Sequence, residues 1–215
     1  MVTAARIPAP GERLLDAAAP EWAAAAEETL ALQPTPWASQ PSEYARNAWK
    51  DRPYGQTATV RVAAAHNGEV LFFRLDWQDE TKDDGLRDTT QFADGAAVLF
   101  PVRGDAQLQT MGSPEQPVNA WYWRADLEAP LEITATGLGT TVRLKDGSVS
   151  AAGSHEAGAW RVVISRPFSV RGDGIAVLAP GQSGKVGVAL WQGSNQERAG
   201  IKATTLDWQP LEIEA

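Results

Sequence analysis

Few residues of this chain have side chains suited to metal binding or redox chemistry. The sequence contains no cysteine, and its two histidines are His66 and His155. Met111 is the only methionine besides Met1. Without cysteine the chain cannot form disulfides, thiolate zinc sites, iron–sulfur ligation or covalent c-type haem links. Any metal chemistry must therefore use methionine, histidine or another nitrogen or oxygen donor.

Met111 begins the most informative segment, MGSPEQPVNAWYWRAD, which covers residues 111–126. The Gly, Ser and Pro that follow it predict a loop that leads into a strand. A lone methionine is most often a filler of a hydrophobic core. Its thioether is also a neutral, soft ligand that suits haem iron. From the residues alone both interpretations stay open, and core packing is the more common of the two.

A second informative segment is WQGSNQERAGIKATTLDWQPL, residues 191–211. Trp191 ends an expected strand, a polar loop follows, and Lys202 begins the last structured stretch. A lysine in such a place usually lies at a solvated strand edge. Lysine binds iron only as the neutral amine, which is scarce in water because the free side chain has a pKa of about 10.4. Burial disfavours the charged form, and metal binding drives loss of the proton.

The elements expected to position these residues are short strands. In VLFFRLDW, the side chains of Leu71, Phe73, Leu75 and Trp77 fall on one face, a period of two. Asn67-Gly68 predicts a hairpin turn before them. AAVLFPV reads as a buried strand, and the sequences that predict further strands are VNAWYWRAD, LEITATG, TTVRLKDG, SVSAAG, AWRVVISRP and KVGVALWQG. Frequent short strands with turns between them predict an all-β fold, an antiparallel β-sandwich.

The first part of the chain is rich in proline and predicts an irregular arm. We expect residues 1–45 to pack on the same domain and residues 46–215 to form the sandwich. Ala23 to Leu32 could form a short helix, and Pro20 suits its first turn. A length of 215 residues fits a single all-β domain.

Composition excludes several classes of function. The net charge is −8, so a nucleic-acid partner is not expected and a basic protein partner is favoured. No apolar stretch approaches the roughly 20 residues that cross a bilayer. The N-terminus shows no signal peptide, as would also hold for a mature exported chain. The GxSxG, HExxH and phosphate-loop motifs of hydrolases and nucleotide-binding enzymes are missing as well.

At the two segments the sequence resembles a known family, the haem-binding gamma subunits of ethylbenzene dehydrogenase, dimethylsulfide dehydrogenase, selenate reductase and chlorate reductase. The motifs that carry the resemblance are FADGAAVLFP, MGSP..PVN.WYWRAD and the closing W.G.NQER.G.K...W..L. They occur in the family's order and span roughly residues 45 to 213. The resemblance implies a sandwich of the immunoglobulin-like or DOMON-like kind that encloses one non-covalent b-type haem.

The resemblance also implies the haem ligands. The methionine of the MGSP motif falls on Met111 and the lysine after the R.G turn falls on Lys202; Lys185 is the runner-up for the lysine. The chain would then be a non-catalytic electron-transfer subunit with no active site of its own. Its implied partners are a molybdenum catalytic alpha subunit, an iron–sulfur beta subunit and a soluble cytochrome, and its implied compartment is the periplasm.

Other residues are weaker candidates. Trp121, Trp123, Phe100 and Trp191 could line the macrocycle, although plain core packing is an equal explanation. Arg124 or Arg198 could pair with haem propionates, although surface solvation is the commoner role. His155 is the chemical rival as a ligand, but its glycine-bounded surroundings predict an exposed turn. His66, next to Asn67-Gly68, is also expected to be exposed.

Two functions of other classes stay open. A carbohydrate-binding module without haem would use the nine tryptophans, and it predicts exposed aromatic side chains on one sheet face. A structural subunit that has lost its cofactor predicts that Met111 and Lys202 face solvent or lie far apart. A haem subunit predicts instead that both side chains point into one cavity.

Overall fold

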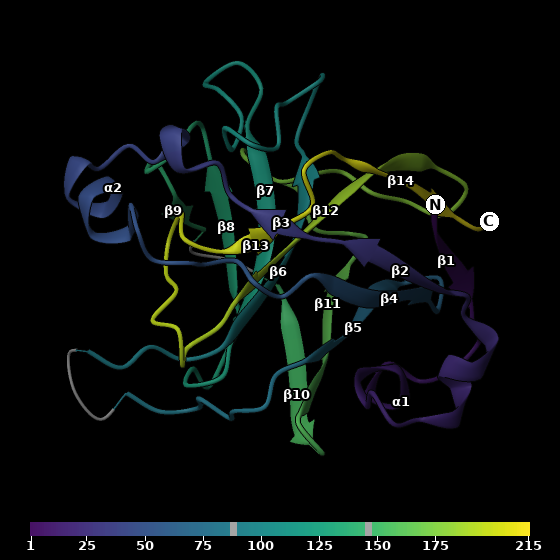
Figure 1. Cartoon of the computed structure of the whole chain (residues 1–215). Helices are drawn as coiled ribbons and strands as arrows, with labels where there is room; N and C mark the ends of the chain where they lie inside the picture. The colour runs from purple at the N-terminus through teal and green to yellow at the C-terminus, as the bar shows by residue number, and fades with distance from the viewer. Residues whose placement is uncertain (87–89, 145–147) are drawn as a thin grey trace.

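The computed structural model describes residues 1–86, 90–144 and 148–215, and its main elements are strands (Figure 1). The helices are short: α1 (Gly11–Leu15) and α2 (Glu43–Trp49), with 3-10 turns η1 (Pro20–Ala24) and η2 (Trp37–Ser39). The strands are β1 (Val2–Arg6), β2 (Glu27–Ala31), β3 (Gln33–Pro34), β4 (Thr59–His66), β5 (Val70–Gln78), β6 (Gly95–Pro101), β7 (Val118–Arg124), β8 (Leu131–Ala135), β9 (Val142–Arg143), β10 (Ser150–Glu156), β11 (Ala159–Pro167), β12 (Ser183–Trp191), β13 (Ala203–Thr204) and β14 (Gln209–Ile213).

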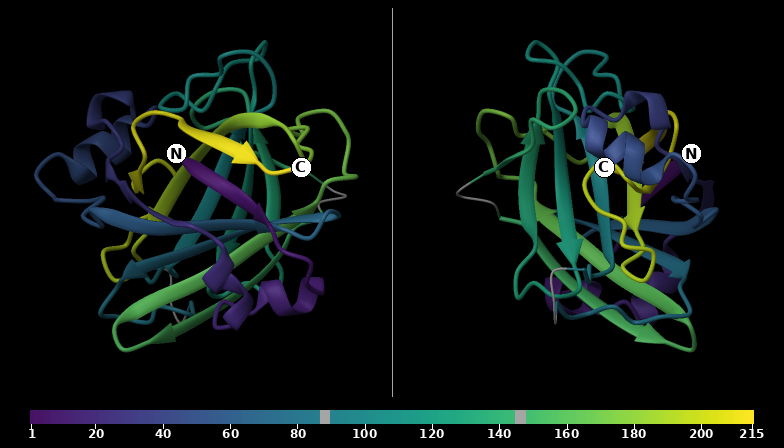
Figure 2. Two further views of the ribbon diagram at one scale, coloured as in Figure 1. Left: turned by 90° about the vertical axis from the view of Figure 1, so that its right-hand side faces the viewer. Right: turned by 60° about the vertical axis from the view of Figure 1, so that its left-hand side comes forward.

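Two layers of strands face each other, as the right-hand view of Figure 2 shows. The first layer has the order β10-β11-β5-β4-β1-β14, with β2 also paired to β4. The second has the order β12-β6-β7-β8-β9, extended by β13 and β3. Strand β12 belongs to both, because its first half pairs with β14 and its second half with β6. The predicted β-sandwich is thus confirmed.

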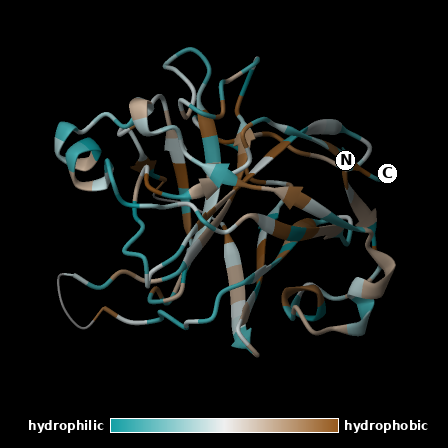
Figure 3. Cartoon of the chain, viewed as in Figure 1, coloured by the Kyte–Doolittle hydropathy of each residue, from teal (hydrophilic) through white to brown (hydrophobic). Residues whose placement is uncertain are grey.

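The alternating strands place their large apolar residues between the two layers. Leu71, Phe73, Leu75 and Trp77 of β5 are all buried there, as the period of two predicts. They meet Trp121 and Trp123 of β7 and Val162 and Ile164 of β11. Figure 3 shows the corresponding hydrophobic stretches along the strands. Burial of this apolar area, at roughly 25 cal/mol per Å², is the main force that holds the layers together.

The hairpin between β4 and β5 forms at the predicted turn. Gly68 has a φ of 96°, a conformation that glycine adopts without steric cost. The side chain of Asn67 accepts hydrogen bonds from the backbone of Glu69 and Val70. The turn therefore fixes the register that pairs His66 with Leu71.

The N-terminal arm is more regular than the sequence predicts. β1 pairs in parallel with both β14 and β4, so the sandwich is not wholly antiparallel, and the two chain ends lie close together (Figure 1). The stretch expected as a helix over Ala23 to Leu32 instead contains the strand β2, and helical structure is limited to η1. Pairing with the exposed edge of β4 outweighs the local helix propensity.

The strand β9 is shorter than the sequence predicts, and the helices are short as well. The predicted strand TTVRLKDG is seen as β9 over two residues, and its residues 145–147 lie outside the described part of the chain. Among the described residues, no helix is long and apolar enough to cross a membrane.

The outer faces of the two layers are covered differently. On the first layer, Leu14 of α1 and Trp22 of η1 pack on Ala63, Phe72 and Val163. On the second layer, α2 stands away from the strands and is anchored through Trp49, which packs with Tyr54 and Ile201. The side chain of Ser42 caps the start of α2 by accepting a hydrogen bond from the amide of Ala45. A space remains between α2 and the second layer.

Candidate functional site

The space between α2 and the second layer is a cavity of about 420 Å³. Its lining is predominantly apolar and contains residues from β6, β7, β8, β12, α2 and four loops. They are Gln40, Pro41, Ser42, Tyr44, Ala45, Ala48, Trp49, Ala97, Leu99, Met111, Ala120, Tyr122, Leu131, Ile133, Leu138, Gly139, Thr141, Trp191, Arg198, Ala199, Gly200, Ile201 and Lys202. A concave apolar site with few polar groups is the usual form of a ligand or cofactor pocket.

Strand alternation gives this cavity its floor. On β7 the odd-numbered Trp121 and Trp123 point between the layers, so Ala120 and Tyr122 face the cavity. Ala97 of β6 lies opposite Tyr122 in the register, and its small side chain leaves room above the sheet. The outer wall is the face of α2 that carries Tyr44, Ala45 and Ala48. The cavity therefore lies between a flat sheet and a short helix.

Met111 reaches the cavity from a strained turn. Its φ is 58°, a left-handed conformation that costs an ordinary residue roughly 1–2 kcal/mol. The turn is held by hydrogen bonds from the amide of Met111 to the carbonyl of Leu108 and from the amide of Gly137 to the carbonyl of Met111. At Gly112 a Cβ atom would lie 2.3 Å from the carbonyl oxygen of Gln116, so only glycine fits. Such strain persists where surrounding structure enforces it, often at functional sites.

Lys202 enters the same cavity beside Met111. Its Nζ lies 3.9 Å from the Sδ of Met111 and 5.1 Å from the ring centre of Trp191. The residue is only 6% exposed, and no carboxylate of the described residues pairs with its ammonium group. Burial lowers the pKa of Lys202 to about 8. At pH 7 roughly a tenth of the amine is thus neutral, far more than for a lysine in water, and the neutral amine is the form that can bind a metal.

A buried carboxylate fixes the loop that leads to Lys202. Glu197, 2% exposed, accepts hydrogen bonds from the amides of Gly55 and Gln192 and from the side chain of Asn195. Burial raises the pKa of Glu197. Because one oxygen of this carboxylate accepts from Gly55 and the other from Gln192, Glu197 joins its own loop to the segment around Gly55.

Two further groups hold the same loop. The carboxylate of Asp94 accepts from the amide of Gly193, the amide of Asp83 and the indole of Trp160, while burial raises the pKa of Asp94 to about 6. The guanidinium of Arg52 donates to the side chain of Gln196 and the carbonyl of Asn195. Sequence reasoning did not single out Asp94, Glu197 or Arg52. The one available signal was the presence of Asp94 and Glu197 within the family motifs FADG and NQER.

The lining of the cavity that the structure describes contains two cationic residues, Lys202 and Arg198, and no carboxylate. Arg198 stacks on the ring of Phe92 at 4.3 Å and donates to the carbonyl of Gln196. It is exposed, so it lies at the rim of the cavity. An anionic group at that rim would meet a guanidinium whose planar donors suit carboxylates.

The structure separates the aromatic candidates. Trp121, Trp123 and Phe100 belong to the core between the layers and do not line the cavity. Trp191 does line it. Arg124 forms a two-point ion pair with Asp126 and is not part of the lining.

The rival ligands lie elsewhere. Lys185 forms an ion pair with Asp105 and is exposed. His155 lies on β10, where its Nε2 lies 2.8 Å from the carbonyl oxygen of Asp79, and so it is not in an exposed turn. His66 is fully buried against Phe168, so the expectation that it is exposed was wrong. Burial lowers the pKa of His66. None of the three lines the cavity.

Met111 and Lys202 are spaced much as two ligands of one metal ion are. In zinc sites, metal–sulfur and metal–nitrogen bonds are about 2.3 and 2.0–2.1 Å long, and two such bonds end to end span about 4.3–4.4 Å. The Nζ–Sδ distance of 3.9 Å is shorter than this span by about 0.4 Å, so a metal ion between the two atoms requires a small outward shift of the side chains. The described residues contain no cluster of three His, Asp or Glu that could hold a metal ion by protein ligands alone. A thioether and an amine of lowered pKa, in an apolar cavity with an arginine at its rim, suit a flat apolar macrocycle that has two carboxylates.

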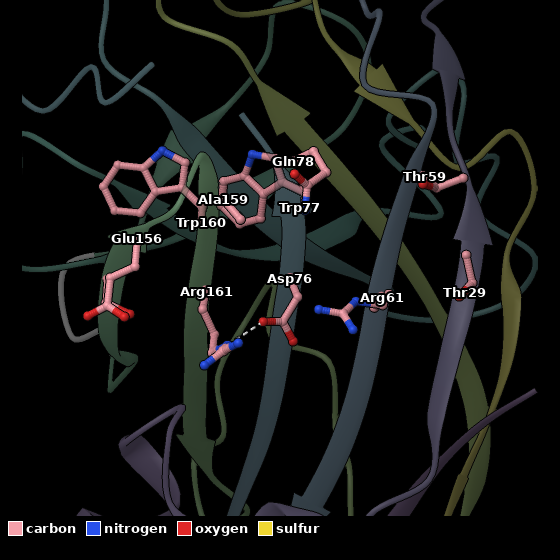
Figure 4. A pocket seen from close by; sticks show the side chains of 11 residues that line it. Thr29, Thr59, Arg61, Asp76, Trp77, Gln78, Glu156, Ala159, Trp160 and Arg161 are labelled. Carbon is pink, nitrogen blue, oxygen red and sulfur yellow. Dashed lines mark hydrogen bonds and ion pairs between the residues drawn. The ribbon is translucent and has the colours of Figure 1, made fainter. Parts of the chain in front are cut away.

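A second hollow, of about 310 Å³, lies on the outer face of the first layer (Figure 4). Figure 4 shows Arg61 and Arg161 pointing toward Asp76 from the two strands that flank it, and Arg161 bonds to its carboxylate. The tryptophans at this hollow, Trp77 and Trp160, are each only 3% exposed. A sugar-stacking platform needs exposed rings, and no tryptophan on the described strands is exposed.

One protein family matches most of the chain. The model of the family described as "Ethylbenzene dehydrogenase" matches residues 19–145 and 136–203. Together these matches cover most of the chain, including Met111 and Lys202.

Three characterised or assigned proteins are similar in sequence. The gamma subunit of chlorate reductase from Ideonella dechloratans is 41% identical over 73% of this chain and 66% of its own length. A Haloferax mediterranei protein assigned as a respiratory nitrate reductase heme subunit is 38% identical over 70% of this chain and 54% of its own length. The gamma subunit of dimethylsulfide dehydrogenase from Rhodovulum sulfidophilum is 36% identical over 68% and 57%. The matches thus span between about half and two thirds of these relatives.

Among solved structures, a Bacteroides uniformis protein assigned as carbohydrate-binding superposes with a TM-score of 0.55 and 10% identity, covering 99% of this chain and 98% of its own. At that identity the similarity concerns the sandwich fold alone. The family match, in contrast, includes the segments that form the cavity. This chain therefore belongs to the ethylbenzene dehydrogenase family.

Proposed function

We propose that this chain is an electron-transfer subunit that holds one b-type haem in the cavity between α2 and the second layer, with Met111 and Lys202 as axial ligands. The observation that carries the proposal is the distance of 3.9 Å between the Nζ of Lys202 and the Sδ of Met111 in one apolar cavity. Two potential ligands that are 91 residues apart in the chain meet there. The name of the Haloferax relative, a heme subunit, supports the cofactor.

The bound haem would accept and donate one electron reversibly. Met111 would present a neutral sulfur, which favours ferrous iron and raises the reduction potential. Lys202 would present a neutral amine from the opposite side, and the apolar walls from α2 and β7 would exclude water. With both axial positions filled, substrates and oxygen would have no free position, so the chain would relay electrons without catalysing a reaction.

We further propose that the chain works within a larger periplasmic complex. Two relatives are named as gamma subunits, of chlorate reductase and dimethylsulfide dehydrogenase, which supports the presence of other subunits. The proposed partners are a molybdenum catalytic alpha subunit and an iron–sulfur beta subunit, with a soluble cytochrome at the other end. The net charge of −8 suits a basic cytochrome. Fractionation of producing cells against a periplasmic marker tests the compartment, and co-purification tests the subunits.

The first experiment is a visible absorption spectrum of the purified chain, oxidised and then reduced with dithionite, with a pyridine haemochrome assay. We expect sharp low-spin α and β bands on reduction and a b-type haemochrome at one haem per chain. Met111→Ala and Lys202→Leu should each lose the low-spin spectrum. Lys185→Ala is the matched control, because Lys185 is a surface lysine paired with Asp105, and its spectrum should equal that of the parent chain.

A chain that stays colourless after incubation with haemin would reject the haem function. A coloured Met111→Ala variant with an unchanged spectrum and potential would reject the ligand. In the colourless case, glycan binding becomes the next function to test.

A further inference from the structure

We propose that Trp191 is a positioning residue for Lys202, an inference that rests on the haem function proposed above. Trp191 is the last residue of β12, and it pairs with Gly95 on the neighbouring strand β6. Its indole contacts both the lysine side chain and the turn from which that lysine emerges.

The first contact is between the ring and the lysine amine. The Nζ of Lys202 lies 5.1 Å from the centre of the Trp191 ring, so the ring lies beside the amine. The described residues provide Lys202 with no ion-pair partner, and its amine lies close to this ring and to the sulfur of Met111. The flexible four-carbon side chain of lysine loses considerable rotamer entropy when it is fixed. A ring beside the amine restricts where it can point.

The second contact is between the indole and the backbone. The Nε1–H of Trp191 donates to the carbonyl of Ala199 at 3.0 Å. Ala199 has a φ of 51°, a left-handed conformation that alanine adopts only at a cost. A backbone bridge between Arg198 and Ile201 closes the same turn. The indole therefore fixes a strained turn that ends one residue before Lys202.

The third contact holds the indole itself. Tyr122 of β7 meets Trp191 edge to face, with 5.1 Å between ring centres. Gly95 leaves room for this arrangement, because a Cβ atom there would make a tight contact of 3.2 Å with the Tyr122 hydroxyl. The ring is thus fixed by the sheet on one side and holds the turn on the other. Residues that contact a metal ligand from behind commonly orient that ligand and tune the metal.

Trp208 provides a matched control within the same chain. Its Nε1–H also donates to a backbone carbonyl, that of Ala106 at 2.6 Å. Both tryptophans are half-buried and pack against the same apolar cluster on the second layer. Trp208 does not line the cavity, so replacing it should disturb packing to a similar degree without affecting the lysine.

The test is a double-mutant cycle on haem release. Trp191→Phe and Trp208→Phe are each made in the parent chain and in a Lys202→Leu chain, and transfer of haem to apomyoglobin is timed. In the parent chain we expect Trp191→Phe to speed release about fivefold to tenfold, the effect of one lost hydrogen bond, and Trp208→Phe to change it less than about twofold. In the Lys202→Leu chain the effect of Trp191→Phe should vanish, because there is no lysine left to position.

Spectroscopy provides a readout that a packing role would not change. Trp191→Phe should alter the ferric low-spin electron paramagnetic resonance signal and raise the midpoint potential, because a loosely held amine stabilises ferric iron less. Trp208→Phe should leave both unchanged. If Trp191→Phe does not fold, as judged by circular dichroism, Trp191→Tyr is measured in its place.

The failures can be told apart. A parent chain that binds no haem overturns the proposed function and this inference together. A parent chain with a normal low-spin haem, in which Trp191→Phe has the same effect with and without Lys202 or leaves the signal unchanged, overturns the role of Trp191 alone.

Discussion

At the scale of single residues, the notable feature is Lys202, a buried lysine that has no carboxylate partner among the described residues. Burial of an ammonium group is unfavourable unless a partner compensates. Among the described residues, the amine of Lys202 contacts the thioether of Met111 and the ring of Trp191, and both interact weakly with a cation. The chain therefore maintains a lysine that is easier to deprotonate than one in water, which is the form that an iron ligand requires.

This burial predicts how the stability of the haem-free chain depends on pH. The pKa of Lys202 is about 8 in the folded chain and about 10.4 when unfolded. Between these values the unfolded chain binds more protons, so the free energy of unfolding rises with pH, by about 3 kcal/mol in all. Below about pH 8 the penalty for the buried charge is fully present.

The measurement is urea unfolding of the haem-free chain from about pH 7 to about pH 10.5. The difference in stability between the parent chain and Lys202→Leu removes the contributions of other titrating groups. That difference should move in favour of the parent chain as pH rises. A difference that stays flat would show that Lys202 is solvated.

Arg198 provides a second prediction at this scale. Because it lies at the rim of the cavity and pairs with no carboxylate of the described residues, it is placed to bind a haem propionate. Arg198→Ala should release haem about tenfold faster, as expected for loss of a charge-assisted hydrogen bond. The control is Arg124→Ala, whose guanidinium is paired with Asp126 outside the cavity. Equal release rates from Arg198→Ala and the parent chain would exclude this contact.

At the scale of elements, the loop from Gln192 to Gly200 positions the site. It contains little regular structure, yet Asp94, Glu197 and Arg52 fix it through hydrogen bonds from three directions. Removal of a buried acceptor leaves its donors unsatisfied, at roughly 1–3 kcal/mol each.

We therefore expect Glu197→Ala to reduce the free energy of unfolding by about 2–4 kcal/mol. The variant should also lose haem faster, since the turn before Lys202 is no longer fixed. Glu156→Ala is the control, because Glu156 is exposed on β10, and its effect should stay within about 0.5 kcal/mol. Denaturant unfolding and haem transfer measure the two effects; a Glu197→Ala chain as stable as Glu156→Ala would contradict the role of the loop.

The strands with strong alternation could be predicted from sequence, and the arm could not. Leu71, Phe73, Leu75 and Trp77 identify β5 because one buried face requires a period of two. β1 and β2 are short, and they form only because the edge of β4, far along the chain, is available to them. The burial of His66 likewise depends on Phe168, which no local pattern reveals.

The site shows the same division. Loop chemistry around Met111 was readable from Gly112 and Pro114, but the meeting of Met111 with Lys202 was not, because periodicity carries no information about pairs 91 residues apart. The pairing was expected from family resemblance alone. The supporting carboxylates Asp94 and Glu197 were missed because an acidic residue in a loop normally indicates solvent exposure.

At the scale of the whole molecule, the two outer faces of the sandwich serve different purposes. The N-terminal arm covers part of the first layer, whereas α2 lies beside the second layer (Figure 2). The cavity lies between α2 and the second layer. Strand β12 joins the layers and ends at Trp191, so the core directly supports the site.

The charge of the whole molecule predicts how it meets a redox partner. With a net charge of −8, electron transfer to the proposed soluble cytochrome, if that protein is basic, should be fast at low ionic strength. The second-order rate constant should fall as salt rises toward about 0.15 M, where the Debye length is about 8 Å. Stopped-flow mixing of the reduced haem-loaded chain with the cytochrome measures it. A rate that increases with salt would point to an acidic partner.

The most direct test of the central claim is the iron X-ray absorption spectrum of the haem-loaded chain. Our account predicts one sulfur and five nitrogens around the iron. It predicts that Met111→Ala removes the sulfur and that Lys202→Leu removes one nitrogen. A spectrum without a sulfur neighbour, or one that neither substitution changes, would contradict axial ligation by Met111 and Lys202.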